Sequence, residues 1–470
     1  MAPAMRGGYL SEGVPASDTM LKVFLWLRYL RKKKIVFLSI AAVAVSVSLL
    51  IVVASLFSGF INAFEQAAVE AIGDVVLYPP TRFAKYPLLI ERLEQTETVD
   101  AATATMMMVP GLLHVGRGTG NVRPVEVWGI EPGRRDKVTG FKRFLLKQKN
   151  LPGEPTFDIP EAPEKTAGFV GIGVLGEPNE QTDEYDPAMA EQMIGTQVIL
   201  TTGTASQPKK GDAAEPPIKR RVLLFTIADV LQTGVYQFDE ACVYLPIEKL
   251  QQTLYPEDES PTAGQVLIKL ADGAEPDVAL AVIRGIWRNF VEEQLEGDPY
   301  LIQRTQVETS KELQKPFVAA YRKQMGILLV IFGVVSIGVI LLIFCIFYMI
   351  VRLKQKDIAI IKSCGATSRS VAVVFVGFGA CVGAVGSGIG AVLGFIITRN
   401  INVIENWIRI IFGLKLWRSS VYFFSKVPNE VDWFWAGRIV VLAVIAAAIG
   451  TLIPAIVAAR TKPVEILRYE

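Results

Sequence analysis

Few residues in this chain of 470 could carry out chemistry by themselves. His114 is the only histidine, so neither a histidine-dependent triad nor a multi-histidine metal site can be assembled. The pattern Gly-x-x-x-x-Gly-Lys-Ser/Thr is absent, so there is no P-loop to hold ATP phosphates. Residues 116–120, GRGTG, open no helix and are typical of a turn between strands. We therefore expect no catalytic residue, metal or cofactor in this chain, and any use of ATP and Mg²⁺ must come from a partner.

A short charged segment between two apolar runs is the strongest candidate for a functional element. It reads QKDIAIIKSCGATSRSV and covers residues 355–371. Ile358 and Ile361, and likewise Ile360 and Cys364, stand three or four positions apart, which predicts one helix with apolar side chains on the cytoplasmic face. Such a helix either lies on lipid or docks on a cytoplasmic partner, and its composition favours neither.

The stretches around this segment are long enough to cross a membrane. The chain is 51% hydrophobic with a mean hydropathy of +0.37, yet 20% of its residues are charged, so the apolar residues must be concentrated. About 20 apolar residues span a hydrocarbon core of roughly 30 Å as a helix. Four stretches meet this requirement: residues 35–57, 325–351, 371–397 and 439–459. The sequence therefore predicts an integral membrane α-helical protein with four transmembrane helices.

The positions of the basic residues predict the orientation of these helices. Residues 1–34 form a basic, amphipathic N-terminus that we expect in the cytoplasm. Four crossings then return the tail, residues 460–470, to the same side, together with residues 352–370. The loop of residues 398–438 must lie outside despite its six basic residues, and it contains a predicted interfacial helix with Val403, Trp407 and Ile410 toward membrane lipid. The formal net charge of only +2 gives no general case for nucleic acid.

A large extracytoplasmic domain is predicted between the first two spans, over residues 58–324. Strand-like runs such as DVVLY and QVLIKL alternate with helical patterns, most clearly in residues 276–295. This mixture predicts an α+β domain. Cys242 is its only cysteine, so the domain has no internal disulfide and depends on its core.

The third predicted span carries a stripe of glycines. Small residues at a spacing of about four let two membrane helices approach closely. The stripe could pack against helices of the same chain or form a dimer seam. Its members are Gly379, Gly383, Gly386, Gly390 and Gly394.

A polar insert predicts a protruding hairpin in the extracytoplasmic domain. Residues 201–221, TTGTASQPKKGDAAEPPIKRR, separate the strand-like runs QVIL and VLLFTI. The prolines would stiffen the tip and the lysines and arginines make it basic. A solvated surface loop is the competing interpretation, since the insert lacks an apolar tip.

Several motifs resemble one family. KQKDIAIIKSCGATSRSV with the following glycine-rich span is similar to the coupling segment of MacB/FtsX-type ABC transporter permeases, and IPAIVAARTKPVEILRYE resembles their C-terminal end. WLRYLRKKK, FSGFINAFEQ, TGVYQFDEACVYLP and VYFFSKVPNEVDW are similar, in order and spacing, to the lipoprotein-releasing branch, the LolC/LolE family. The resemblance covers nearly all of the chain after the first 20 residues. The stretch near residues 152–163 and the insert after Leu200 depart from the pattern.

The resemblance implies a mechanical transporter of the bacterial inner membrane with a MacB-like periplasmic core domain. Two such permeases, as a homodimer or with a paralogue as the second permease subunit, pair with two copies of a cytoplasmic, LolD-like ABC ATPase subunit. The residues implied to couple to it are Lys356, Asp357, Ile358, Ile360, Ile361, Lys362, Gly365 and Ala366.

The same resemblance implies that an acylated lipoprotein is held between the first two spans and passed to a periplasmic, LolA-like lipoprotein carrier. Both spans lack charges, as an apolar substrate cavity requires, although any lipid-facing helix looks alike. The implied cavity residues are Leu50, Val53, Ala54, Phe57, Leu329, Phe332 and Val335. The hairpin stands where one such permease has its chaperone hook, at Pro208, Lys209, Lys210, Gly211, Pro216 and Pro217. A MacB-like exporter of toxins or peptides and an FtsX-like signalling subunit are the alternative functions.

Overall fold

The computed structural model describes residues 34–115, 122–159, 165–179, 182, 184–205, 218–258, 260–413, 417 and 426–461. The described chain divides into two compact units. The helical unit takes the described residues within 1–59, 320–401 and 428–470. The core unit takes those within 60–319 and 402–427.

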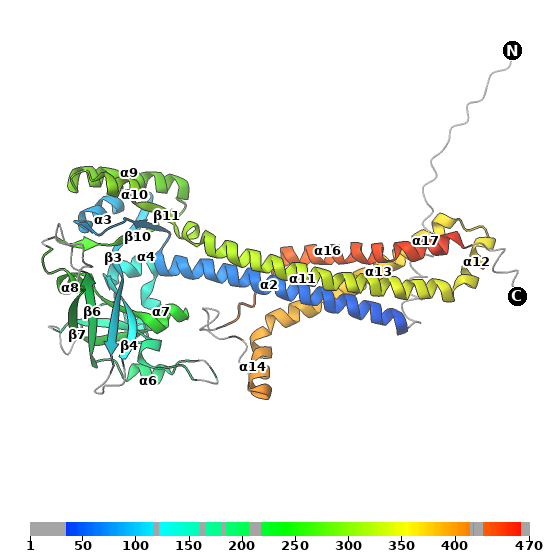
Figure 1. The fold of residues 1–470 in the computed structure, drawn as a ribbon, viewed down its shortest axis with the longest axis horizontal. Coiled ribbons are helices and arrows are strands. Elements are labelled where there is room, and N and C mark those ends of the chain that lie inside the picture. Colours follow the sequence, from blue (N-terminus) through cyan, green and yellow to red (C-terminus); the bar gives the residue numbers. More distant parts are fainter. Residues whose placement is uncertain are drawn as a thin grey trace, which may run out of the picture. The chain divides into compact units, whose positions relative to one another are not determined.

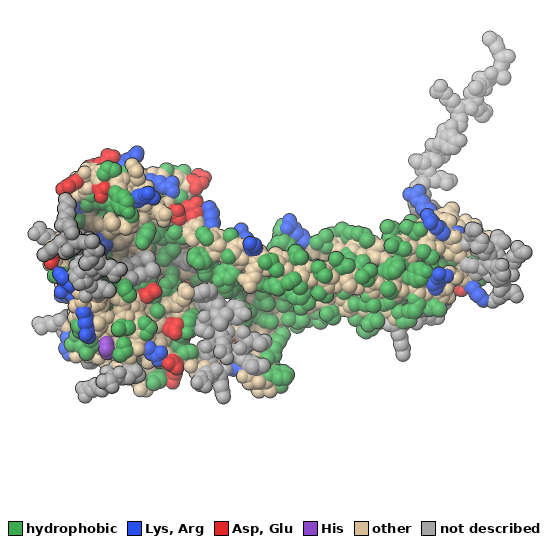
Figure 2. All heavy atoms as spheres, viewed as in Figure 1, with side chains coloured by type: hydrophobic (Ala, Val, Ile, Leu, Met, Phe, Trp, Pro, Cys, Tyr) green, Lys and Arg blue, Asp and Glu red, His purple; other side chains and the backbone are tan. Residues whose placement is uncertain are grey.

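Four helices of the described chain are long and apolar enough to cross a membrane, in agreement with the sequence. They are α2 (Lys34–Ile72), α11 (Ser310–Leu353), α13 (Ser368–Arg399), and α16 (Trp433–Gly450) continued by α17 (Leu452–Arg460) (Figure 1). The short α12 (Gln355–Ser363) joins α11 to α13. Figure 2 shows hydrophobic side chains covering these long helices, which is the surface that lipid requires.

The helix ends differ from the predicted spans. Helix α2 has 39 residues, about 58 Å of helix, and continues well past residue 57. It continues because residues 58–72 include several alanines and glutamates, which are strong helix formers although they are not all apolar. Helix α11 begins at Ser310 rather than at 325. The predicted fourth span is broken at Thr451, because Pro454 has no N–H to donate to the carbonyl of Gly450.

The described part of the core unit contains a nine-stranded sheet of order β11-β1-β10-β3-β4-β8-β5-β7-β6. An additional pairing of β3 with β6 closes the last six strands on themselves. The strands are β1 (Val75–Tyr78), β3 (Val99–His114), β4 (Val122–Ile130), β5 (Ala167–Gly171), β6 (Gln197–Ala205), β7 (Ile218–Leu231), β8 (Cys242–Pro246), β10 (Gln265–Leu270) and β11 (Gln306–Thr309), with β2 (Phe83–Ala84) and β9 (Thr262–Ala263) forming a separate pair.

Helices cover this sheet, as expected for an α+β domain. They are α3 (Tyr86–Glu94), α4 (Pro132–Thr139), α5 (Ile172–Leu175), α6 (Pro187–Glu191), α7 (Tyr236–Ala241), α8 (Ile247–Leu254), α9 (Pro276–Gln294) and α10 (Pro299–Arg304), with 3-10 turns η1 (Phe141–Phe144) and η2 (Gln148–Asn150). A further helix, α14 (Ile401–Phe412), has no buried residue. Helix α9 buries Trp287 and Phe290, whose rings meet Phe83 at centroid distances of 5.1 and 6.2 Å. These aromatic contacts join α9 to the separate β2–β9 pair.

Helices α2 and α11 enter the core unit at neighbouring strands. Strand β1 follows α2, strand β11 precedes α11, and the two strands pair antiparallel with Val75 opposite Thr309. The amide of Ser310 also donates to the carbonyl of Asp74 over 2.9 Å. One hydrogen-bonded ladder therefore receives the ends of both long helices.

A buried carboxylate shapes the loop before α7. Asp239 accepts hydrogen bonds from the amide and the hydroxyl of Thr233, over 2.6 and 2.8 Å, and from the amide of Gly234 over 2.9 Å. Burial raises the pKa of Asp239 to about 6, against the lowering effect of these donors.

Candidate functional site

Helix α12 is a separate short helix between two long ones. It follows α11 after a break at Lys354 and ends before Gly365, whose φ of 99° is a backbone conformation that favours glycine. Thr367 then starts α13, because its hydroxyl accepts the amide of Ser370 over 3.1 Å. Gly365 and Thr367 thus account for the break between α12 and α13.

The two faces of α12 differ from the predicted ones. Ile358 was expected to be exposed, but it is buried against Val351, Val371 and Ala458. The side chains of Ile360 and Ile361 are each 52% exposed and form the apolar surface of the helix. Periodicity could not identify the buried face, because Ala458 comes from α17, nearly 100 positions later in the chain.

Polar contacts hold α12 against its neighbours. The ammonium of Lys362 donates to the carbonyls of Ala459 and Thr461, over 2.8 Å each, at the end of α17. Lys354 forms an ion pair with Asp357 at the start of α12. Among the other predicted coupling residues, Lys356 and Gly365 are exposed and Ala366 is half-buried. An apolar groove of about 130 Å³ runs beneath the helix, lined among others by Ile350, Ile358, Ile361, Val374 and Phe378.

The helical unit encloses an apolar cavity of about 320 Å³ between α2, α11 and α16. Its only polar side chains are those of Ser46 and Ser336, whose hydroxyl oxygens lie 2.9 Å apart, so that one hydrogen bond links α2 to α11. The lining residues are Val43, Ser46, Val47, Leu50, Leu329, Gly333, Ser336, Val339, Ile340, Ile343, Trp435, Ile439, Leu442, Ala443, Ala446 and Ala447.

Two of the seven predicted cavity residues, Leu50 and Leu329, line this space. Ala54 is buried and Val335 is exposed, while Val53, Phe57 and Phe332 are half-buried elsewhere. The contribution of α16 was not predicted, since hydropathy identifies a span but not its neighbours. The serines could have been noticed, because hydroxyl groups within spans often bond between helices.

The glycine stripe packs within the chain on two sides. A Cβ added at Gly386 or Gly390 would lie 2.8 Å from Val43 Cβ or 2.6 Å from the Ala44 carbonyl, so α2 crosses here. Gly394 faces α2 as well, while Gly379 and Gly383 meet Thr451 and Ala447. The described contacts therefore assign these glycines to close packing of α13 on α2 and on α16–α17.

The predicted hook residues Pro208, Lys209, Lys210, Gly211, Pro216 and Pro217 lie outside the described residues. The strands that flank them are longer than expected, with Ala205 opposite Ile218. Strand β7 therefore includes Lys219, Arg220 and Arg221, which the sequence had suggested as part of the polar insert. The tail beyond residue 461 is likewise outside the described range.

The predicted interfacial helix corresponds to α14. Val403, Trp407 and Ile410 are exposed on it. Its polar side is held by Asn402, whose amide group donates to the carbonyl of Val427 and accepts the Val427 amide, over 3.0 Å each. An apolar surface on a helix that is anchored only by its polar side suits contact with lipid.

Comparison with known proteins identifies the family. The MacB-like periplasmic core domain family matches residues 36–286, and the FtsX-like permease C-terminal family matches residues 329–463. The chain is 28% identical to the lipoprotein-releasing system transmembrane protein LolC of Neisseria meningitidis, over 96% of this chain and 99% of that protein. It is 24% identical to LolE of Haemophilus influenzae, over 91% of this chain and 93% of that protein.

A solved structure is also similar. The periplasmic region of MacB from Actinobacillus actinomycetemcomitans matches with 13% identity and a TM-score of 0.27, covering 53% of this chain and 95% of that one. The two matching families together account for both units of the chain, and LolC and LolE are similar over nearly its whole length. This chain therefore belongs to the permeases that join a MacB-like periplasmic core domain to an FtsX-like permease C-terminal segment.

Proposed function

We propose that this chain is the permease subunit of an ABC transporter that releases lipoproteins from the bacterial inner membrane. The observation that carries the proposal is the nearly full-length similarity to LolC and LolE, which are named as lipoprotein-releasing transmembrane proteins. ATP hydrolysis is assigned to a separate ATPase subunit, because the sequence has no P-loop.

The proposed docking surface for the ATPase is the exposed pair Ile360 and Ile361 on α12. Half-exposed isoleucines on a helix that is otherwise fastened to α17 give a partner an apolar surface on a rigid support. In this arrangement both chain termini are cytoplasmic and the core unit is periplasmic. Movement of the ATPase would pass through α12 into α11, α13 and α17.

The cavity between α2, α11 and α16 is the proposed entry for acyl chains. Its wall is apolar apart from Ser46 and Ser336, so a lipid chain could occupy it without leaving a charge unpaired. The hydrogen bond between these serines would have to break for α2 and α11 to separate around a substrate. The released lipoprotein would then pass to a periplasmic carrier, for which the hairpin of β6 and β7 is the proposed contact.

Depletion of this permease in its own cells tests the proposal. Acylated lipoproteins labelled with radioactive palmitate are expected to accumulate in the inner membrane, and expression of the wild-type chain should return them to the outer membrane. If lipoprotein sorting is normal but sensitivity to exported toxins rises, the protein is a MacB-like exporter instead. Normal sorting with a defect in cell-wall hydrolysis would identify an FtsX-like signalling subunit.

A further inference from the structure

The end of α2 is fastened to the core unit by a buried arginine from α4. The guanidinium Nη2 of Arg135 donates to the carbonyl of Ala71 over 2.9 Å, and Nη1 donates to the hydroxyl of Thr105 over 3.3 Å. Ala71 lies in the last turn of α2, where helix carbonyls lack intrahelical partners and carry partial negative charge. Arg135 therefore joins the helix end to α4 and β3 at once.

Burying the guanidinium group of Arg135 at this position costs free energy. Its side chain is 3% exposed, its Nε is buried without a hydrogen-bond partner, and no carboxylate among the described residues pairs with it. Its guanidinium carbon lies 5.6 to 5.9 Å from the ring centroids of Trp128, Phe141 and Tyr244, which compensate in part. Burial lowers the pKa of Arg135. A core that needed only stability would be served as well by an apolar side chain of similar volume.

A second arginine contacts the neighbouring residue of α2. The carboxylate of Glu70 in α2 pairs with Arg143 of η1 over 2.9 Å and accepts the Gln66 amide over 3.1 Å. Both partners are partly exposed, so this pair alone would hold the helix weakly. These two arginines thus contact α2 at its final residues.

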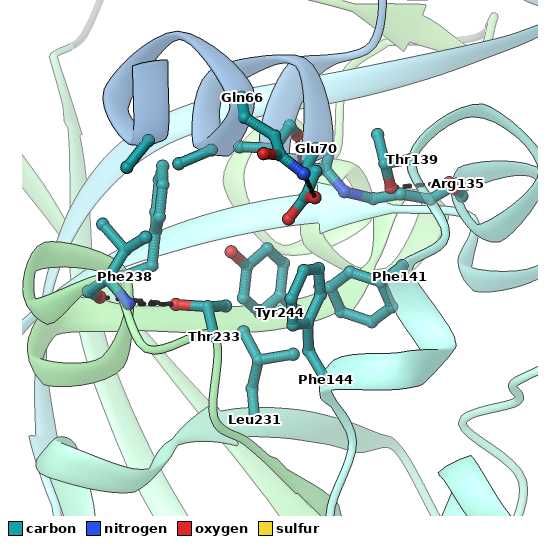
Figure 3. Close-up of a pocket in the computed structure, with 14 residues that line it drawn as sticks. Gln66, Glu70, Arg135, Thr139, Phe141, Phe144, Leu231, Thr233, Phe238 and Tyr244 are labelled. Carbon is teal, nitrogen blue, oxygen red and sulfur yellow. Dashed lines mark hydrogen bonds between the residues drawn. The ribbon is translucent and has the colours of Figure 1, made fainter. Parts of the chain in front are cut away.

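One face of the preceding turns of α2 borders an open pocket. Figure 3 shows Gln66 and Glu70 on α2 facing Phe141, Phe144 and Tyr244 across a pocket. The pocket has a volume of about 230 Å³, and its α2 side consists mainly of small residues: Ala63, Gln66, Ala67, Glu70 and Ala71. In the same turns, Phe60 and Phe64 contact Trp417 and Phe317 at ring-centroid distances of 6.4 and 6.2 Å. The bonds of Arg135 are therefore the contacts that hold α2 at its final turn, beyond these aromatic contacts.

We propose that Arg135 is the positioning residue that attaches α2 to the core unit, so that movement of α2 in the membrane moves the core unit instead of only bending the helix end. Glu70 and Arg143 support the same attachment. This inference rests on the proposed function, since the movement in question is that of an ATP-driven permease.

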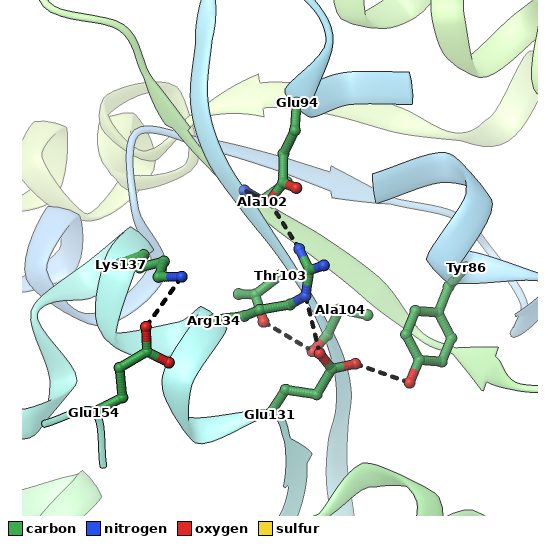
Figure 4. A network of polar contacts seen from close by, with 9 residues as sticks. All are labelled: Tyr86, Glu94, Ala102, Thr103, Ala104, Glu131, Arg134, Lys137 and Glu154. Carbon is green, nitrogen blue, oxygen red and sulfur yellow. Dashed lines mark hydrogen bonds and ion pairs between the residues drawn. The ribbon is translucent and has the colours of Figure 1, made fainter. Parts of the chain in front are cut away.

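The test compares Arg135→Met with Arg134→Met in the full-length permease, reconstituted with its ATPase in lipid nanodiscs. Arg134 is the matched control, because it stands next in α4 but pairs with Glu94 and Glu131 of the core unit, over 2.8 and 3.3 Å, and not with α2 (Figure 4). Lipoprotein released per ATP hydrolysed should fall about tenfold in R135M, a typical coupling effect, with ATPase activity within about twofold of wild type. R134M should keep the wild-type ratio.

A second readout does not depend on transport. Hydrogen exchange of the amides at the end of α2, residues 69–75, should accelerate in R135M and not in R134M, because the helix end loses its anchor. If R135M does not fold, the partly exposed ion pair of Glu70 and Arg143 provides the test instead. Glu70→Arg and Arg143→Glu should each lower the amount of lipoprotein released per ATP, and the double variant should restore it. Wild-type exchange at the α2 end in R135M, or a wild-type release ratio in all of these variants, would overturn the inference. A wild-type complex that releases no lipoprotein would instead refute the proposed function, and the exchange measurement would still decide on Arg135.

Discussion

Replacing Gly390 by alanine should destabilise the helical unit through a single methyl group. The added Cβ would lie 2.6 Å from the backbone carbonyl oxygen of Ala44 and 2.9 Å from the side-chain Cβ of Val47, both in α2. An ordinary contact needs at least 3.4 Å, so α2 and α13 must separate locally by about 0.8 Å. Overpacking of this kind costs about 1–3 kcal/mol of unfolding free energy.

Alanine also favours helix formation relative to glycine, by up to about 1 kcal/mol, and this gain would hide part of the cost. Gly388→Ala is the control that removes this ambiguity. Gly388 is in the same helix and exposed, and a Cβ there meets no atom within 4 Å. The two variants share the propensity gain, so the difference between them isolates the contact with α2.

Thermal unfolding of the purified protein in detergent measures this difference. G390A should melt below G388A by at least about 2 °C, the lower end of the shift expected for 1 kcal/mol in a large domain. Equal melting temperatures would refute the reasoning, because they would mean that the close approach of α2 to α13 has no energetic consequence.

Three further predictions concern α12 and the core unit. Alanine at both Ile360 and Ile361 should reduce the amount of ATPase that co-purifies, at unchanged melting temperature, and equal co-purification would contradict the docking surface. Ile358→Ala should instead lower the melting temperature, because truncating a buried isoleucine typically costs about 2–5 kcal/mol of unfolding free energy. Lys362→Met should weaken substrate-stimulated ATP hydrolysis, since α12 loses its two contacts with the end of α17. Because the folded-state pKa of Asp239 is raised to about 6, its protonated form stabilises the fold at low pH and this contribution is lost as the pH rises through 6. The unfolding free energy of wild type relative to Asp239→Asn should therefore fall between pH 4 and 7, and a difference independent of pH would contradict the assignment.

The four apolar helices and the mixed α and β character of the core unit were predictable, because hydropathy and residue periodicity depend on local sequence alone. The limits of the helices were not. A hydropathy pattern marks only the apolar part of a helix. Helix α2 continues beyond that part to Ile72, because residues such as Ala63 and Ala67 favour a helix in any solvent.

What the sequence could not supply was the identity of distant neighbours. Ile358 and Ile361 have the same side chain, but Ile358 is buried in a cluster to which Ala458 of α17 contributes, whereas Ile361 is exposed. The cavity has α16 as its third wall, and Arg135 acquires its role from Ala71, which is 64 positions away. Each of these contacts depends on the tertiary arrangement, which a local sequence pattern does not predict.

The junction of β1 and β11 indicates why an attachment at Arg135 matters. If α2 and α11 ended in unrelated parts of the core unit, movement of one could be absorbed by deformation between them. They end instead in paired strands, with Val75 opposite Thr309 and the Ser310 amide bonded to Asp74, so relative sliding of the two ends would break ladder hydrogen bonds. The ladder resists sliding but not rotation of α2 about Gly73, whose φ of 76° allows a turn there. Arg135 acts on the carbonyl two residues before this glycine, and therefore restricts rotation of the helix end at this point.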